Sequence, residues 1–110
     1  MGDTQSEVAR YRQQVEDEWQ NPVVAAAYRK WSREEAEWGR AARELMLERA
    51  QLARGMEVLD LGSAHGEPVL AMAEAVGPDG HVTLTDIAPT LLEIAADRAR
   101  AAALTNVTTR

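Results

Sequence analysis

Apolar residues in the first part of the chain recur with the period of a helix. Between residues 6 and 19 they are spaced so that one face of a 3.6-residue helix carries all four, Val8, Tyr11, Val15 and Trp19. Most other positions in this stretch are charged or polar. The pattern predicts a first helix over residues 6–19 with a single apolar stripe.

Two further helices are predicted in the first half of the chain. Pro22 suits the first position of a helix, because the amide hydrogen that it lacks has no partner there in any helix. A second helix is therefore expected over residues 22–31. Ser32 and Glu35 have the spacing of a capping box, in which each side chain bonds the backbone amide of the other residue. A third helix is therefore expected over residues 32–54.

The hydrophobic pattern changes at residue 56. Residues 56–61 form a short run with apolar side chains on both faces, as in a parallel strand buried on both sides. Residues 81–86 alternate between apolar and polar positions and predict a second strand, and residues 106–109 begin a third. Helices are expected between them, over residues 68–76 and 89–104. Strands that alternate with helices in this way predict an α/β fold with a doubly wound parallel sheet.

The two patterns divide the chain into two domains, a helical N-terminal cap over residues 1–55 and an α/β domain over residues 56–110. Nearly all of the net charge of −6 lies in the second domain. An acidic surface of this kind argues against a nucleic-acid partner, which would require a basic one. No apolar run approaches the roughly 20 residues that cross a membrane, and no membrane partner is expected. The chain has no cysteine, which fits the expected cytoplasmic location.

A loop rich in small residues follows the first predicted strand. Residues 60–66 read Asp-Leu-Gly-Ser-Ala-His-Gly, and they lie where the strand meets the next helix. Small residues allow the backbone to turn sharply and allow a ligand to approach the main chain. Asp86 follows Gly66 by 20 residues, at the end of the second strand. A carboxylate at that position can accept hydrogen bonds from both hydroxyls of a ribose.

The spacing of the glycines distinguishes between two kinds of nucleotide. The dinucleotide fingerprint GxGxxG, counted from Gly62, requires glycine where this chain has Ala64 and Glu67. Glu67 would also place negative charge where a pyrophosphate binds. The spacing fits better the pattern acid-x-Gly-x-Gly-x-Gly, in which Asp60 is the acid. S-adenosylmethionine has no phosphate, and its cationic end suits an acidic residue.

Three segments together resemble the class I S-adenosylmethionine-dependent methyltransferases: Val58–Met72, Gly77–Gly80 and Val82–Pro89. They are most similar to the branch that includes quinone-biosynthesis C-methyltransferases and many small-molecule methylases. The resemblance covers about 50 residues and implies a Rossmann-like sheet, of which this chain holds the first three strands. It also implies S-adenosylmethionine as the cofactor and a small molecule as the methyl acceptor.

The resemblance assigns roles to seven residues, which would form the cofactor-binding site. Asp60 and the loop from Gly62 to Gly66 would hold the methionine part, Asp86 would hold the ribose, and Ile87 would flank the adenine. The residues are Asp60, Gly62, Ser63, Ala64, Gly66, Asp86 and Ile87. Ala64 departs from the family pattern, which has glycine there, and its methyl group is expected to tighten the loop.

The family resemblance also reaches the helical cap, whose aromatic residues can close over a cofactor or substrate. Tyr11, Tyr28 and Trp31 are candidates for that role. Trp31 and Trp38 lie seven residues apart, a spacing that favours packing between helices over cofactor stacking. His65 is expected to be an exposed loop residue. With two histidines and no cysteine, no metal site is expected.

The sequence leaves open whether these 110 residues catalyse a reaction. Related domains continue through four further strands, which carry the adenine-side acid and most substrate-binding groups, so no catalytic residue is assigned. The first hypothesis is methyl transfer from S-adenosylmethionine to a small-molecule acceptor. The alternative is a truncated, inactive module for cofactor binding or self-association. A nicotinamide-dependent oxidoreductase ranks below both.

A three-stranded parallel sheet leaves strand edges unpaired and one face incompletely covered. A second copy of the chain could pair with those edges or exchange elements across them. The sequence therefore predicts a homo-oligomer.

Overall fold

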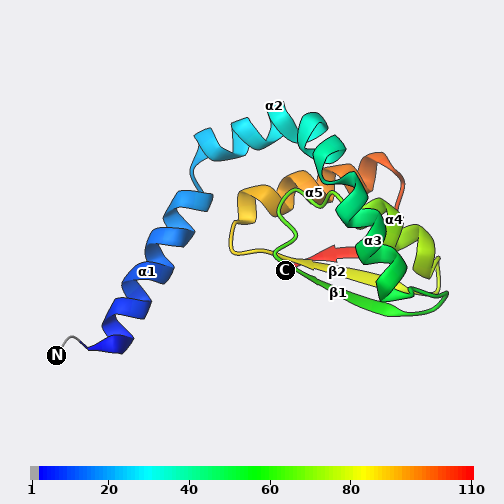
Figure 1. Ribbon diagram of the computed structural model, residues 1–110, viewed down its shortest axis with the longest axis horizontal. Coiled ribbons are helices and arrows are strands. Elements are labelled where there is room, and N and C mark those ends of the chain that lie inside the picture. Colours follow the sequence, from blue (N-terminus) through cyan, green and yellow to red (C-terminus); the bar gives the residue numbers. More distant parts are fainter. Residues whose placement is uncertain (1–2) are drawn as a thin grey trace.

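The computed structural model describes residues 3–110, with the side chains at positions 32, 33, 35 and 36 left out of the description. Three helices come first, and a β-α-β-α-β unit follows them (Figure 1). The elements in order are α1 (Thr4–Trp19), α2 (Pro22–Trp38), α3 (Arg40–Ala50), β1 (Glu57–Leu61), α4 (Val69–Val76), β2 (His81–Thr85), α5 (Pro89–Ala101) and β3 (Val107–Thr109). The α/β fold class and the helical N-terminus that the sequence predicts are confirmed.

The three strands form one parallel sheet in the order β1-β2-β3. Leu59 of β1 lies beside Thr83 of β2, and Leu84 of β2 lies beside Thr109 of β3. Val82 and Leu84 are fully buried against the two crossover helices. The core beneath them consists of apolar residues from α4 and α5, namely Val69, Met72, Ala73, Val76, Leu92 and Ala95. This half-sheet is the frame on which the loop after β1 is held.

One face of β1 is open, so the expectation that this strand is buried on both faces is wrong. Leu59 is 61% exposed and Leu61 is 76% exposed. Right-handed crossovers that run in one direction, from β1 to β2 to β3, place both connecting helices on the same face of the sheet. The leucines lie on the other face, which no described element covers. The homo-oligomer stays a prediction. The open face and the unpaired edge of β1 are the surfaces at which a second copy could bind.

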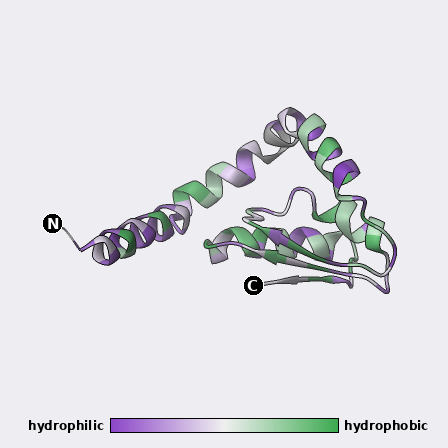
Figure 2. Cartoon of the chain, turned by 60° about the horizontal axis from the view of Figure 1, so that its bottom comes forward, coloured by the Kyte–Doolittle hydropathy of each residue, from purple (hydrophilic) through white to green (hydrophobic). Residues whose placement is uncertain are grey.

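Helix α1 is confirmed, beginning two residues earlier than predicted. The Asp3 carboxylate caps its start by accepting a hydrogen bond from the Gln5 amide at 3.1 Å. The helix extends away from the rest of the chain (Figure 1), and polar and apolar residues alternate along it (Figure 2). Its predicted apolar stripe is mostly exposed, and only near its end does Trp19 meet the ring of Tyr28, at a centroid distance of 5.7 Å.

Helix α2 continues through position 32, where the sequence predicts a new helix. The side chains of Ser32 and Glu35 lie outside the described ones, but the backbone there is helical. The break comes instead at Gly39, a residue with low helix propensity. Trp31 and Trp38 therefore share one helix. They are 53% and 85% exposed, so the expected packing between helices is also wrong.

Helix α3 is shorter than predicted and ends at Ala50; the next residue, Gln51, adopts a left-handed conformation with φ of 50°. The next residues cross to the sheet, and the Gly55 amide donates a hydrogen bond to the Val76 carbonyl at 2.8 Å. That bond joins the start of β1 to the end of α4. In the part of the chain that the structure describes, no helix is both long and apolar enough to span a bilayer.

Helix α2 packs against α5 and so covers the end of the sheet where the loop lies. Ala88, Leu91 and Ile94 are buried there against four partly buried residues, Trp19, Ala25, Tyr28 and Ala64. Ala64 belongs to the loop after β1. A single apolar cluster therefore holds the helical cap, the start of α5 and the loop together.

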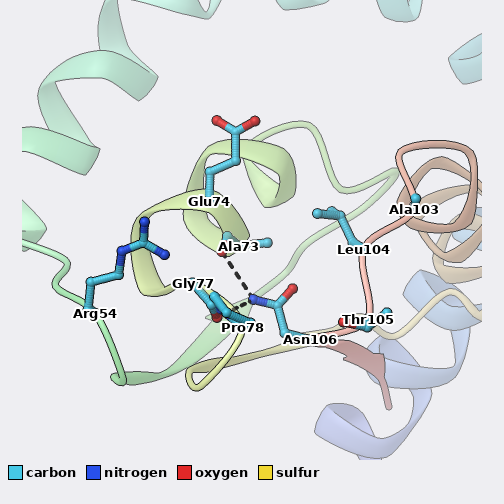
Figure 3. A pocket seen from close by; sticks show the side chains of 9 residues that line it. All are labelled: Arg54, Ala73, Glu74, Gly77, Pro78, Ala103, Leu104, Thr105 and Asn106. Carbon is cyan, nitrogen blue, oxygen red and sulfur yellow. Dashed lines mark hydrogen bonds between the residues drawn. The ribbon is translucent and has the colours of Figure 1, made fainter.

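Asn106 ties the opposite end of the sheet to α4. Its side-chain amide is buried and donates to the Ala73 carbonyl at 3.0 Å and to the Gly77 carbonyl at 2.8 Å (Figure 3). These two carbonyls lie at the end of α4, and each also accepts a backbone amide, from Gly77 at 3.0 Å and from Gly80 at 3.1 Å respectively. The surrounding hollow of about 390 Å³ includes Arg54 and Glu74. Because both amide hydrogens of Asn106 are used internally, we read this end of the sheet as structural.

Replacement of Asn106 by alanine should lower the free energy of unfolding by about 1–3 kcal/mol, because two buried hydrogen bonds between the end of α4 and the start of β3 are lost. Thr105→Ala, at the exposed neighbouring position, is the matched control and should change it by less than about 0.5 kcal/mol. Urea unfolding followed by circular dichroism measures both. Equal stabilities of the two variants would show that Asn106 does not clamp α4.

Candidate cofactor site

The loop after β1 places every second residue in the left-handed region of backbone conformation. Gly62, Ala64 and Gly66 have φ values of 68°, 47° and 74°. This conformation costs residues with a side chain roughly 1 kcal/mol or more, whereas it costs glycine almost nothing. The alternation explains physically why the acid-x-Gly-x-Gly-x-Gly pattern has glycines two residues apart. Ala64 keeps the same geometry, and its methyl group joins the apolar cluster beneath α2.

The two glycines of the loop have different surroundings. A methyl group added to Gly66 would lie 2.7 Å from the Cβ of Ala95, so Gly66 allows the loop to lie directly on α5. A methyl group added to Gly62 would meet no atom within 4 Å. Gly62 therefore leaves open space above the end of β1, where a ligand can approach the main chain.

Ser63 and Thr85 fix the start of the loop to the end of β2. The Ser63 amide donates to the Thr85 carbonyl at 2.7 Å, and the Thr85 amide donates to the Ser63 hydroxyl oxygen at 3.1 Å. Both hydroxyls donate to the Asp60 carbonyl, at 3.0 Å from Ser63 and 2.8 Å from Thr85. Sequence reasoning missed Thr85. Its place directly before Asp86, at the end of a strand beside the loop, is the signal that could have identified it.

The Asp86 carboxylate holds both the loop and the start of α5. One oxygen accepts a hydrogen bond from the Ala64 amide at 2.8 Å, and the other accepts from the Ala88 amide at 2.9 Å. Hydrogen bonds of this kind, with a charged acceptor, are worth about 1.5–3 kcal/mol each. Each oxygen has a second lone pair and can still accept a bond from a ligand hydroxyl. Asp86 is therefore placed to shape the site as well as to contact a ligand.

Asp60 carries a polar atom without a partner. Its Oδ2 is buried and makes no hydrogen bond among the described residues. Leaving such an atom unsatisfied is costly, and native proteins usually do so where a ligand or water completes the bonding. Asp60 lies near the end of β1, two residues before Gly62. A cationic or hydrogen-bond-donating ligand group fits this position.

His65 is buried, with 4% of its surface exposed, so the expectation of an exposed loop residue is wrong. The ring of Tyr28 from α2 lies edge-on to the His65 ring, with centroids 5.3 Å apart. The cap thus covers the loop, which no pattern within the loop itself could indicate. Of the three cap aromatics singled out in the sequence, Tyr28 reaches the loop, Trp31 lines a cavity beside Tyr28, and Tyr11 is exposed on α1.

The remaining predicted residues fit the same end of the sheet. Ile87 directly follows Asp86 and is 39% exposed, so its apolar surface is available to a flat ligand group. Glu67 lies just after the loop and forms an ion pair with Arg98 of α5 at 2.6 Å. A carboxylate held here disfavours a pyrophosphate. The structure brings the seven predicted residues to one edge, the carboxyl ends of β1 and β2.

Residues 52–110, more than half of the chain, match the family described as methyltransferase domain. Among curated proteins, the chain is 44% identical over 63 residues to a protein-L-isoaspartate O-methyltransferase of Ignicoccus hospitalis, covering 57% of this chain and 30% of that protein. It is 42% identical over 50 residues to a ubiquinone/menaquinone biosynthesis C-methyltransferase of Bordetella avium, covering 46% of this chain and 20% of that protein. The chain thus spans less than a third of either relative.

Solved structures show the same likeness. A SAM-dependent methyltransferase from Aquifex aeolicus aligns with a TM-score of 0.56 at 29% identity, covering 60% of this chain and 35% of that one. Coclaurine N-methyltransferase, solved with N-methylheliamine and SAH, aligns with a TM-score of 0.59 at 31% identity, covering 67% of this chain and 21% of that one. The family match, the fold and the loop geometry agree, and the chain belongs to the class I S-adenosylmethionine-dependent methyltransferases.

Proposed function

We propose that the carboxyl ends of β1 and β2 bind S-adenosylmethionine, and that the protein transfers its methyl group to a small-molecule acceptor. The observation that carries the proposal is the buried Oδ2 of Asp60, which has no partner among the described residues and belongs to the strand end that leads into the loop at Gly62. The cationic methionine end of the cofactor supplies the positive charge and N–H donors that this atom lacks.

The other residues of the site complement the rest of the cofactor. Asp86 keeps acceptor capacity on both oxygens after bonding the Ala64 and Ala88 amides, and two ribose hydroxyls can use it. Ile87 offers an apolar surface to the adenine. Because the loop is already held by Ser63 and Thr85, little ordering is needed when the ligand binds. The cofactor itself supplies the reactive methyl group, and the protein binds and orients it.

A small-molecule acceptor is supported by the likeness to a small-molecule enzyme, coclaurine N-methyltransferase, and to a quinone-biosynthesis C-methyltransferase. The isoaspartate relative acts, by its name, on a protein. The net charge of −6 weighs against a nucleic-acid acceptor. We also propose that the protein is cytoplasmic, because its sequence has no cysteine.

The second candidate is an inactive module that binds the cofactor or associates with itself. The exposed face of β1, with Leu59 and Leu61, favours it, because such a face is suited to contact with other protein. A nicotinamide dinucleotide is disfavoured by the Glu67–Arg98 pair, which places a carboxylate where a pyrophosphate would lie.

Isothermal titration calorimetry with S-adenosylmethionine and with NAD separates these functions. The proposal predicts saturable heat with S-adenosylmethionine and none with NAD. Methyl transfer from radiolabelled cofactor to a panel of small amines, phenols and quinols then separates an enzyme from a binding module. Heat with NAD alone, or with neither ligand, would contradict the proposed site.

Asp60→Asn should lower the affinity for S-adenosylmethionine about tenfold or more, because it removes a charge-assisted contact worth about 1.5–3 kcal/mol. The free energy of unfolding should stay the same or rise, because Oδ2 of Asp60 has no protein partner to lose. The matched control is Asp79→Asn, an exposed turn residue at the other end of the sheet. Calorimetry and urea unfolding test both. An affinity equal to that of the control would remove Asp60 from the site.

A further inference from the structure

One flank of α2 forms an aromatic cavity that the proposed cofactor site does not use. The cavity has a volume of about 440 Å³, and its described lining residues are Ala27, Tyr28, Trp31, Glu34 and Trp38. Positions 27, 31, 34 and 38 recur at helical spacing, so their side chains share one face of the helix. Two tryptophans on one face, 53% and 85% exposed, leave a large aromatic surface in contact with water.

The chemistry of the lining favours a positively charged organic ligand. The faces of indole and phenol rings carry negative electrostatic potential and attract ammonium groups. Glu34 is the one charged side chain among the described lining residues, and its charge is negative. The ring of Trp31 can take an ammonium, since Nζ of Lys30 lies over it, 4.8 Å from its centroid; a ligand uses the opposite face or displaces Lys30.

We propose that this cavity is a binding site for an organic ammonium compound, held by the faces of Trp31 and Trp38 and by the Glu34 carboxylate. An anion would be repelled by Glu34 and by the net charge of −6. A neutral apolar molecule would gain nothing from Glu34. The ligand therefore combines a positive charge with an apolar body that can cover the rings.

The cavity is joined to the loop after β1 through Tyr28. This residue lines the cavity, and its ring is also in edge contact with His65, between Ala64 and Gly66. A ligand in the cavity therefore lies one side chain away from the loop. The inference goes beyond the proposed cofactor site and does not depend on it, because it concerns binding of a cation at α2 alone.

The test is a titration of the full chain, without S-adenosylmethionine, with choline and with its uncharged analogue 3,3-dimethyl-1-butanol. The indole N–H signals of the three tryptophans are followed by ¹H–¹⁵N NMR. Choline should shift the signals of Trp31 and Trp38 more than that of Trp19, which does not line the cavity. It should bind about tenfold more tightly than the uncharged analogue, as expected for a cation–π site.

Two variants separate charge from shape. Glu34→Gln should weaken choline binding several-fold, whereas Glu44→Gln on α3, which makes the same change in net charge at an exposed position, should not. Trp38→Leu should also weaken it, and because Trp38 is largely exposed the fold should persist, as circular dichroism would show.

Equal binding of choline and its analogue, equal shifts of all three tryptophans, or no saturable shift would each overturn the proposal. Choline binding without S-adenosylmethionine binding would instead refute only the cofactor site. The two proposals therefore fail separately.

Discussion

The Asp86 carboxylate is the interaction on which the arrangement of this molecule most depends. One oxygen holds the Ala64 amide in the loop after β1, and the other holds the Ala88 amide at the start of α5. The bond to Ala64 helps to offset the cost of the left-handed conformation of that residue. Both amides belong to residues of the apolar cluster beneath α2. One side chain thus links the loop, the sheet and the cap.

The consequence for function is a site that is largely formed before a ligand arrives. Ser63 and Thr85 fix the loop to β2, and Gly66 lies directly on α5. The ring of Tyr28 lies edge-on against the ring of His65. The groups that a ligand can use include the open space at Gly62, the second lone pairs of Asp86, the exposed surface of Ile87 and the unpartnered oxygen of Asp60. These are the groups that a nucleoside joined to a cationic amino acid can use.

The sequence predicted well what local chemistry decides. The strands at β1 and β2 follow from short apolar runs between turn residues, and the loop follows from glycines two residues apart. Prediction from the sequence failed where contacts between distant parts of the chain determine whether a residue is buried. Leu59 and Leu61 have the pattern of a buried strand, but burial depends on what covers the second face. His65 is buried, and one of the residues against it is Tyr28 of α2, far away in the sequence. The capping signal at Ser32 and the low helix propensity of Gly39 both favour a break between helices there, and their free energies differ by about 1 kcal/mol or less. The local pattern therefore could not decide at which of the two residues α2 ends.

The central claim, that the loop after β1 and the end of β2 together form a preformed cofactor site, is tested most directly by backbone amide NMR with S-adenosylhomocysteine. A preformed site predicts shifts concentrated at residues 60–66 and 86–88, with the Ala64 amide among the largest and with little change in α1 or at the Asn106 end of the sheet. Shifts spread over the whole chain would mean that the ligand orders a site that was not formed before. No shift at Ala64 would place the cofactor elsewhere and contradict the account.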